Sequence, residues 1–209
     1  MSALLPDPRA ALAAALARFV PDGAQEAADR DRIVAFVARH AAPFDRAIAE
    51  GHLTGSAITV SADGTRVLLL HHRKLGRWLQ PGGHADPGET GGEAVALREA
   101  LEETGIQGLA LHPTAPRPLD VDVHDIPARG SEPAHEHLDL RYLVVAPEGA
   151  VVSPQLAEMH AIRWVAWDEV AALSPDHGLR RALAKARALV ASISQPRGLP
   201  LPRATRSRP

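Results

Sequence analysis

The sequence contains no cysteine among its 209 residues. Disulfide cross-links, thiolate nucleophiles and cysteine-containing zinc sites are therefore excluded, and the chain has no need of an oxidising compartment. Aromatic residues are scarce, at three Trp, three Phe and one Tyr, so the core must be built mainly from Ala, Val, Leu and Ile. No apolar run approaches the roughly 18 residues that a membrane-spanning helix needs. We therefore expect a cytoplasmic protein with no membrane partner.

An excess of charge of one sign is absent as well. The 23 Lys and Arg residues face 25 Asp and Glu residues, which gives a formal net charge of −2. This balance does not favour a surface built for nucleic acid, so we do not expect nucleic acid as a partner. The hydrophobic fraction of 45% is typical of a soluble globular chain of one or two domains.

The periodicity of the apolar residues divides the chain into four parts. Residues 1–53 show helical spacing and are expected to form an N-terminal helical extension. In residues 54–175, strands and helices follow one another without a regular βαβ period, which predicts an α/β domain around a mixed sheet. Residues 176–195 are expected to form a C-terminal helix. Residues 196–209 are rich in Arg and Pro and are expected to be a disordered tail.

The segment around residues 90–105 is predicted to be a helix. Thr90 and Glu93 have the spacing of a capping box, which predicts that the helix begins there, and Gly105 is placed to end it. Four residues at helical spacing share one side and are expected to face the core, namely Ala94, Leu97, Leu101 and Thr104.

The opposite side of this helix carries three carboxylates within one turn, those of Glu99, Glu102 and Glu103. At about 6 Å, each like-charged pair costs about 0.7 kcal/mol in bulk water and about 3 kcal/mol at an effective dielectric constant of about 20. An exposed helix tolerates the smaller cost, so a solvated acidic face is one interpretation. In a cleft, a cation would have to neutralise the group, and oxygen ligands favour Mg²⁺ or Mn²⁺ over zinc.

The segment from Gly82 to Ile106 resembles the Nudix box, the signature of the Nudix (MutT-like) hydrolases. The box reads Gly-x5-Glu-x7-Arg-Glu-U-x-Glu-Glu-x-Gly-U, where U is an apolar residue. Its defined positions are filled here by Gly83, Glu89, Arg98, Glu99, Ala100, Glu102, Glu103, Gly105 and Ile106. Eight residues instead of seven separate Glu89 from Arg98, so the insertion bears on the ion pair that the family forms between these two positions.

The resemblance implies an α/β fold of the Nudix type, an α/β/α sandwich around a mixed sheet. It also implies an enzyme that hydrolyses a diphosphate linkage in a nucleoside diphosphate derivative, with Mg²⁺ or Mn²⁺ as cofactor. The partner would be a small nucleotide-type substrate. Such domains often form homodimers, so a homodimer is compatible with this interpretation.

Carried over by position, the resemblance implies a role for each residue of the box. Glu99, Glu102, Glu103 and the carbonyl of Gly83 would be metal ligands. Glu102 and Glu99 would be the catalytic residues, with Glu102 favoured as the group that takes the proton of the attacking water. Three residues would have structural roles, namely Glu89, Arg98 and Gly105.

A catalytically silent nucleotide-binding regulator on the same fold is the alternative function. Such proteins usually lose one or more of the acidic metal ligands, whereas all three are present in this chain. The retained acids favour the enzyme.

A second group of polar residues follows about thirty positions after the box. On a strand, His135, His137, Asp139 and Arg141 would share one face. If the preceding strand closes a symmetric hairpin, His124 lies opposite His137 and Asp122 opposite Asp139, and His84 from the box could join them. We predict that this face contacts substrate phosphate or binds an additional metal. A polar strand face exposed to water is the alternative. Two cationic residues before the box, Arg73 and Lys74, are further candidate phosphate contacts.

Overall fold

The structure is a computed structural model, and it describes residues 7–115, 117–153 and 159–194. The predicted tail, residues 196–209, lies outside the described part. The helices are α1 (Pro8–Ala17), α2 (Gly23–Arg39), α3 (Gly92–Thr104), the short 3₁₀ helix η1 (Val170–Leu173) and α4 (His177–Ser194). The strands are β1 (Gly51–Val60), β2 (Arg66–His72), β3 (Arg77–Leu79), β4 (Gly82–His84), β5 (Ala110–Leu111), β6 (Asp120–Ile126), β7 (His135–Val145) and β8 (Met159–Ala166).

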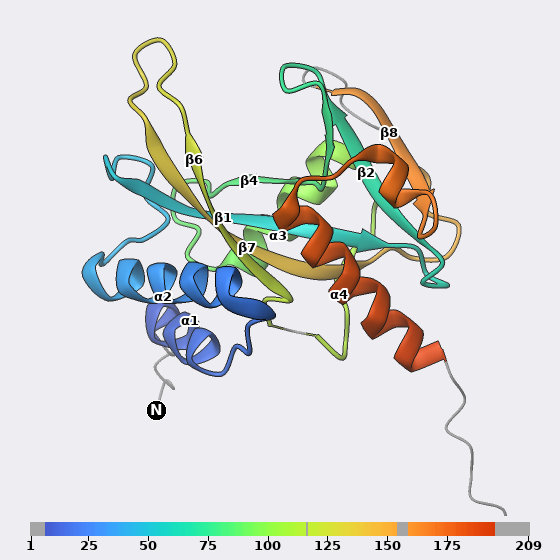
Figure 1. Cartoon of the computed structure of the whole chain (residues 1–209), viewed down its shortest axis with the longest axis horizontal. Helices are drawn as coiled ribbons and strands as arrows, with labels where there is room; N and C mark the ends of the chain where they lie inside the picture. Colours follow the sequence, from blue (N-terminus) through green and yellow to red (C-terminus); the bar gives the residue numbers. More distant parts are fainter. Residues whose placement is uncertain (1–6, 116, 154–158, 195–209) are drawn as a thin grey trace, which may run out of the picture.

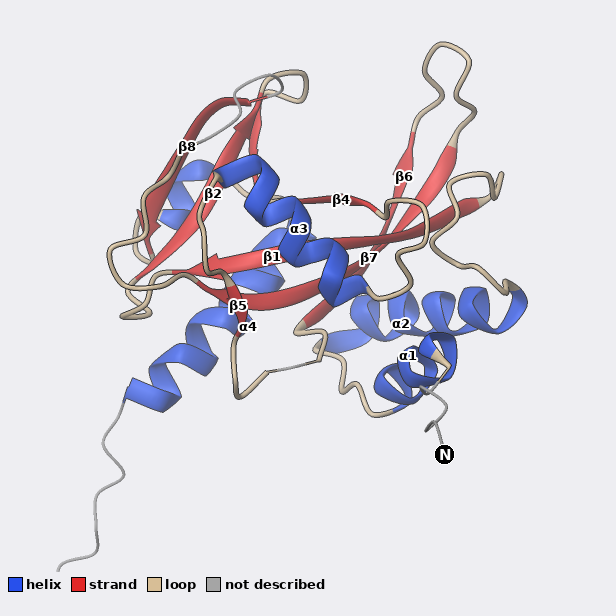
Figure 2. Ribbon diagram, turned by 180° about the vertical axis from the view of Figure 1, so that it is seen from behind, coloured by secondary structure: helices blue, strands red, loops and turns tan. Residues whose placement is uncertain are grey.

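The strands form one mixed sheet, which confirms the prediction. Its order is β3-β2-β1-β7-β5, with β4 beside β1, β6 beside β7 and β8 beside β2. The pair β1 and β7 is parallel along the whole of β1, whereas β6 and β7 form an antiparallel hairpin. The helix α4 lies in front of the sheet in Figure 1, and α3 lies in front when the molecule is seen from behind in Figure 2. Helices therefore cover both faces, as expected for an α/β/α sandwich.

Each face of the sheet has its own hydrophobic cluster. On the α3 side, the cluster includes Leu16 of α1, Phe36 of α2, Leu53 of β1, Val95 of α3 and Leu140 of β7. On the α4 side, it includes Ile58 of β1, Val67 of β2, Leu143 of β7, Val165 of β8 and Leu183 of α4. The predicted N-terminal extension thus shares its core with the sheet. Within the described ranges, no helix is both long and apolar enough to cross a membrane.

The helix α3 begins later than predicted. Its first residue is Gly92, and the capping position is taken by Gly91, which has no side chain to form a cap. The predicted capping box of Thr90 and Glu93 is therefore wrong. Gly105 ends the helix in the left-handed conformation, with φ of 68°, as predicted.

The buried side of α3 also differs from the prediction, because Gly55 of β1 sets the approach of the helix. A Cβ atom on Gly55 would lie 2.5 Å from the carbonyl oxygen of Gly92 and 2.8 Å from Cβ of Val95. The helix backbone therefore packs directly on the strand, and small side chains occupy the contact. The buried residues are Gly92, Val95, Ala96, Ala100 and Thr104, whereas Leu101 is 38% exposed and Ala94 is exposed.

The strand β1 begins at Gly51, earlier than the predicted change of period at residue 54. Its ten residues pair in register with residues 136–145 of β7, and this long-range ladder extends the strand. His52 therefore belongs to the sheet, although it falls within residues 1–53, the predicted helical extension.

A buried ionic network connects the helices α2 and α4 to the sheet. Asp120 of β6 accepts hydrogen bonds from Arg181 of α4 at 2.7 Å and from Arg141 of β7 at 3.1 Å. Lys185 of α4 donates to Glu26 of α2. Burial raises the pKa of Asp120, but the hydrogen bond from Arg181 and the charge of Arg141 outweigh this effect and hold the pKa below its usual value. Asp120 is thus a charged residue inside the protein.

Candidate active site

Arg98 of α3 connects the loop before the helix to the acidic side of the helix. Its Nη2 group donates to a carboxylate oxygen of Glu89 at 2.9 Å and to the carbonyl of His84 at 2.7 Å. Its Nη1 group donates to Glu99 at 3.0 Å and to Glu102 at 3.1 Å. The hydrogen bonds from Arg98 lower the pKa of Glu89. The extra residue between Glu89 and Arg98 thus leaves their ion pair intact, because the loop ahead of Gly92 accommodates it.

The carboxylate of Glu99 lies directly against the backbone of β4. A Cβ atom on Gly83 would lie 2.6 Å from Oε1 and 2.9 Å from Oε2 of Glu99, so any larger residue at position 83 would displace this carboxylate. The side chain of Glu99 is 17% exposed, and burial raises its pKa in spite of the hydrogen bond from Arg98.

The other two glutamates of the helix differ in their surroundings. Glu103 accepts a hydrogen bond from the backbone N–H of Gly82 at 3.0 Å, so it also lies against β4. The side chain of Glu102 is 55% exposed and reaches solvent. The predicted acidic face therefore exists, with two carboxylates on the strand and one at the surface.

This donor set fits a hard divalent cation. Three carboxylates and the backbone carbonyl of Gly83 offer only oxygen atoms, which Mg²⁺ and Mn²⁺ prefer. The carboxylate of Glu99 can approach the backbone of Gly83 closely because Gly83 has no side chain. Arg98 offsets part of the negative charge, since it contacts Glu89, Glu99 and Glu102.

A pocket of about 610 Å³ lies beside the loop of the box, between that loop and the N-terminal segment. Its lining combines Leu12 of α1, residues 41–46 and residues 85–90. Glu89 is part of the lining, whereas Glu99, Glu102 and Glu103 are not. The N-terminal segment therefore forms a cavity next to the loop of the box, and the acidic side of α3 does not line this cavity.

The predicted hairpin has the symmetric register. His124 of β6 pairs with His137 of β7, and Asp122 pairs with Asp139. His84 also joins this group, because its Nε2 atom lies 3.1 Å from Nε2 of His137.

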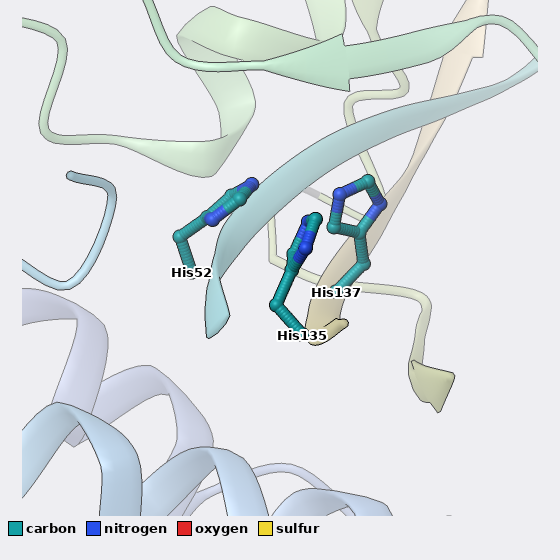
Figure 3. A group of neighbouring side chains, drawn as sticks. All are labelled: His52, His135 and His137. Atoms are coloured by element: carbon teal, nitrogen blue, oxygen red, sulfur yellow. The ribbon is translucent and has the colours of Figure 1, made fainter. Parts of the chain in front are cut away.

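A fifth histidine, His52 of β1, was not among the predicted site residues, and it pairs in register with His137. Its ring lies among those of the other histidines, with centroid distances of 5.0 Å to His84 and 5.1 Å to His135. Figure 3 shows His52 and the two histidines of β7 side by side. The signal that could have revealed it is the alternation of polar with apolar or small residues that is typical of a strand. The polar positions are His52, Thr54 and Ser56, and the positions between them are Leu53, Gly55 and Ala57.

Burial and mutual proximity keep His52, His84 and His137 neutral. Burial, together with the charges of His84 and His135, lowers the pKa of His52 to about 4. Burial, followed by the effect of His84 and His124, lowers the pKa of His137 to about 2. Burial also lowers the pKa of His84. These three imidazoles therefore carry lone pairs at neutral pH.

Asp139 and Arg141 are not available to a ligand, which corrects their predicted contact with substrate. Asp139 is 2% exposed and accepts hydrogen bonds from Thr54 at 3.0 Å and Ser56 at 2.9 Å. Arg141 is 3% exposed and pairs with Asp139 and Asp120. Their charges neutralise one another inside the protein.

Arg73 and Lys74 lie in the loop between β2 and β3 and are exposed. Their predicted contact with phosphate stays a prediction.

The fold and the acidic helix define the class of protein: a mixed sheet between helices, with a glutamate-rich helix packed on a Gly-Gly strand. Residues 51–186 match the NUDIX domain, so the chain belongs to the Nudix hydrolases, a family of pyrophosphohydrolases. The matched part begins with β1 and ends within α4.

Two comparisons with individual proteins agree with this assignment. A Bacillus subtilis protein named "Putative 8-oxo-dGTP diphosphatase" is 43% identical over 51 residues, which are 24% of this chain and 34% of that protein. The match thus spans about a third of the length of that relative. The crystal structure of a NUDIX-family hydrolase from Clostridium perfringens superposes with a TM-score of 0.52 at 22% identity, covering 68% of this chain and 97% of that one. This likeness confirms the Nudix-type fold.

Proposed function

We propose that the protein hydrolyses a diphosphate linkage in a nucleoside diphosphate derivative and that Mg²⁺ or Mn²⁺ is required. The cation would be held by Glu99, Glu102, Glu103 and the carbonyl of Gly83. The observation that carries this proposal is the contact of the Glu99 carboxylate with Gly83, where a methyl group would displace the carboxylate. When bound, the cation would neutralise phosphate charge and lower the pKa of the attacking water.

The residues of the chain would position this chemistry. Arg98 holds Glu99 and Glu102 through one nitrogen, Nη1, which fixes the relative placement of the two carboxylates. It is itself held by Glu89 and by the carbonyl of His84. Such positioning is the main contribution of a protein to phosphoryl-transfer chemistry.

Glu102 is the residue that we propose to accept the proton of the attacking water. Its side chain is 55% exposed and can approach a bound substrate, whereas Glu99 lies against the strand. Glu99 would act beside it as a catalytic metal ligand. Exposed Arg73 and Lys74 stay proposed contacts for the polyphosphate.

The test is a hydrolysis screen over a panel of nucleotide derivatives, with Mg²⁺ and with Mn²⁺, in which the products are separated by anion-exchange chromatography because cleavage yields pyrophosphate or phosphomonoesters. The panel includes nucleoside triphosphates, 8-oxo-dGTP, dinucleoside polyphosphates and nucleoside diphosphate sugars. We expect turnover of at least one compound and a loss of about 10²-fold or more in kcat for Glu102→Gln, the range typical of a lost general base. Glu93→Gln on the same helix is the matched control, because Glu93 faces Tyr142 instead of β4.

Two results would contradict the proposal. Equal turnover by Glu102→Gln and the unchanged protein would show that the acidic side of α3 is not the active site. Nucleotide binding by calorimetry, without turnover of any compound in the panel, would instead identify a regulator on the Nudix fold.

A further inference from the structure

Five histidines from four neighbouring strands meet on one face of the sheet. They are His52 of β1, His84 of β4, His124 of β6, and His135 and His137 of β7. The strand register brings them together, since His52 and His124 both pair with His137. We call this group the histidine cluster. The proposed hydrolysis does not require it.

The histidine cluster lies on the opposite face of the sheet from the acidic side of α3. A Cβ atom on Gly83 would point at Glu99, whereas the side chain of His84, the next residue along β4, contacts His137. Adjacent residues of a strand point to opposite faces, so β4 separates the two groups. A ligand of the histidine cluster would therefore occupy a site distinct from the glutamates.

Three members of the histidine cluster have the arrangement of a metal site. His52, His135 and His137 each offer a ring nitrogen, and the three nitrogen atoms lie within 4.8 Å of one another. Two nitrogen ligands on a tetrahedral zinc ion, at about 2.0–2.1 Å from the metal, would lie about 3.3 Å apart. Rotation of the rings would close the remaining difference. Figure 3 shows the three rings gathered at the start of β1 and β7.

Unsatisfied nitrogen atoms indicate that this site takes a ligand. His52 is 2% exposed, and neither of its ring nitrogens has a hydrogen-bond partner among the residues that the structure describes. A buried polar group without a partner is costly, so native proteins rarely keep one without a reason. A metal ion bound to one nitrogen of His52 would satisfy that atom.

The orientation of His135 supports the same ligand. Its Nδ1 atom lies 2.9 Å from the carbonyl oxygen of Pro133, and a carbonyl can only accept, so Nδ1 carries the hydrogen. The lone pair is then on Nε2, which is buried and has no hydrogen-bond partner within the described part of the chain. Metal-binding histidines are usually oriented in this way, by a hydrogen bond from the other nitrogen to a carbonyl or carboxylate.

We propose that His52, His135 and His137 bind a divalent transition-metal ion, with Zn²⁺ as the ion that we expect. Nitrogen donors favour zinc and its neighbours over Mg²⁺, which prefers oxygen. His84 is the candidate for the fourth position, since its Nε2 atom is 3.1 Å from that of His137. The ion would join β1, β4 and β7 next to the loop that connects β6 and β7.

The test uses the full chain without a polyhistidine tag. The protein is freed of metal with a chelator, dialysed against Zn²⁺, and analysed for bound zinc by elemental mass spectrometry. We expect one zinc per chain and a rise in Tm of about 5–10 °C when zinc is about 100-fold above its Kd. His52→Asn combined with His137→Asn should lose both effects. The matched control is His71→Asn with His160→Asn, a neighbouring pair outside the histidine cluster, with ring centroids 5.8 Å apart.

A variant of the acidic helix separates this inference from the proposed function. Glu99→Gln combined with Glu102→Gln and Glu103→Gln should retain the zinc, whatever its activity. Loss of zinc from this variant, or equal zinc in the unchanged protein and in the His52 and His137 double variant, would overturn the inference.

Diffraction decides the question if the double histidine variant fails to fold. Data from crystals of the unchanged protein, collected at the zinc absorption edge, should show a peak between the rings of His52, His135 and His137. A peak at the glutamates alone, no peak, or a phosphate ion between the rings would contradict the proposal.

Discussion

The replacement Gly83→Ala tests the proposed metal site with the addition of one methyl group. The new Cβ atom would lie 2.6 Å from Oε1 of Glu99, whereas ordinary contacts begin at 3.4 Å. The carboxylate of Glu99 would therefore have to move by about 0.8 Å, the difference between these two distances. Gly83 does not have a positive φ, so alanine can adopt its backbone conformation.

The expected effect is a large loss of activity with little loss of stability. A misplacement of about 1 Å at a catalytic centre can cost about 10²-fold in rate, so we expect kcat/KM to fall by this order. Thermal unfolding should show a stability change of less than about 1 kcal/mol, because Glu99 can yield towards solvent. The assay is steady-state hydrolysis with saturating Mg²⁺ on the best substrate from the panel.

A double-mutant cycle with Glu99→Asp supplies the control. Aspartate is shorter by one methylene group, so the methyl group introduced by Gly83→Ala would have less carboxylate to displace. In the Glu99→Asp background, Gly83→Ala should therefore cost clearly less than in the unchanged protein. Equal losses in both backgrounds would show that the methyl group does not act through Glu99 and would refute the reasoning.

Two other replacements test the interactions around the site and in the core. Arg98→Lys should lower kcat/KM by about tenfold, because a single ammonium group cannot contact Glu89 and Glu102 together as the guanidinium does. Unchanged kinetics would show that Arg98 does not position the carboxylates. Asp120→Asn should lower the free energy of unfolding by about 3–5 kcal/mol at pH 7, since it removes the carboxylate that lies nearest to the buried charge of Arg181 and also pairs with Arg141. Folding lowers the pKa of Asp120, so its contribution to the free energy of unfolding is present above pH 3.8 and is lost as the pH falls further. Urea unfolding should therefore show that the difference in stability between Asp120→Asn and the unchanged protein becomes smaller below pH 3.8.

Local patterns in the sequence predicted the parts of the protein that depend on neighbouring residues. The placement of His124 opposite His137 followed from the length of one hairpin loop and the two-residue repeat of a strand. The end of α3 at Gly105 followed from the preference of glycine for the left-handed conformation. The spacing of the box also placed Glu99, Glu102 and Glu103 on one side of the helix.

Contacts between distant parts of the chain explain what the sequence did not reveal. The buried side of α3 depends on Gly55, a residue of another element whose small size lets the helix approach. The inclusion of His52 in the sheet depends on pairing with residue 137. The buried pair of Arg181 and Asp120 joins α4 to β6, and no local pattern indicates that partner.

Manganese binding tests the central claim most directly, namely that the acidic side of α3 holds a divalent cation. Crystals soaked in Mn²⁺ should give an anomalous peak beside the carboxylate of Glu99 and the carbonyl of Gly83, and crystals of Glu99→Gln should give a weaker peak or none. A map with no peak near Glu99, Glu102 or Glu103 at saturating Mn²⁺ would contradict the account.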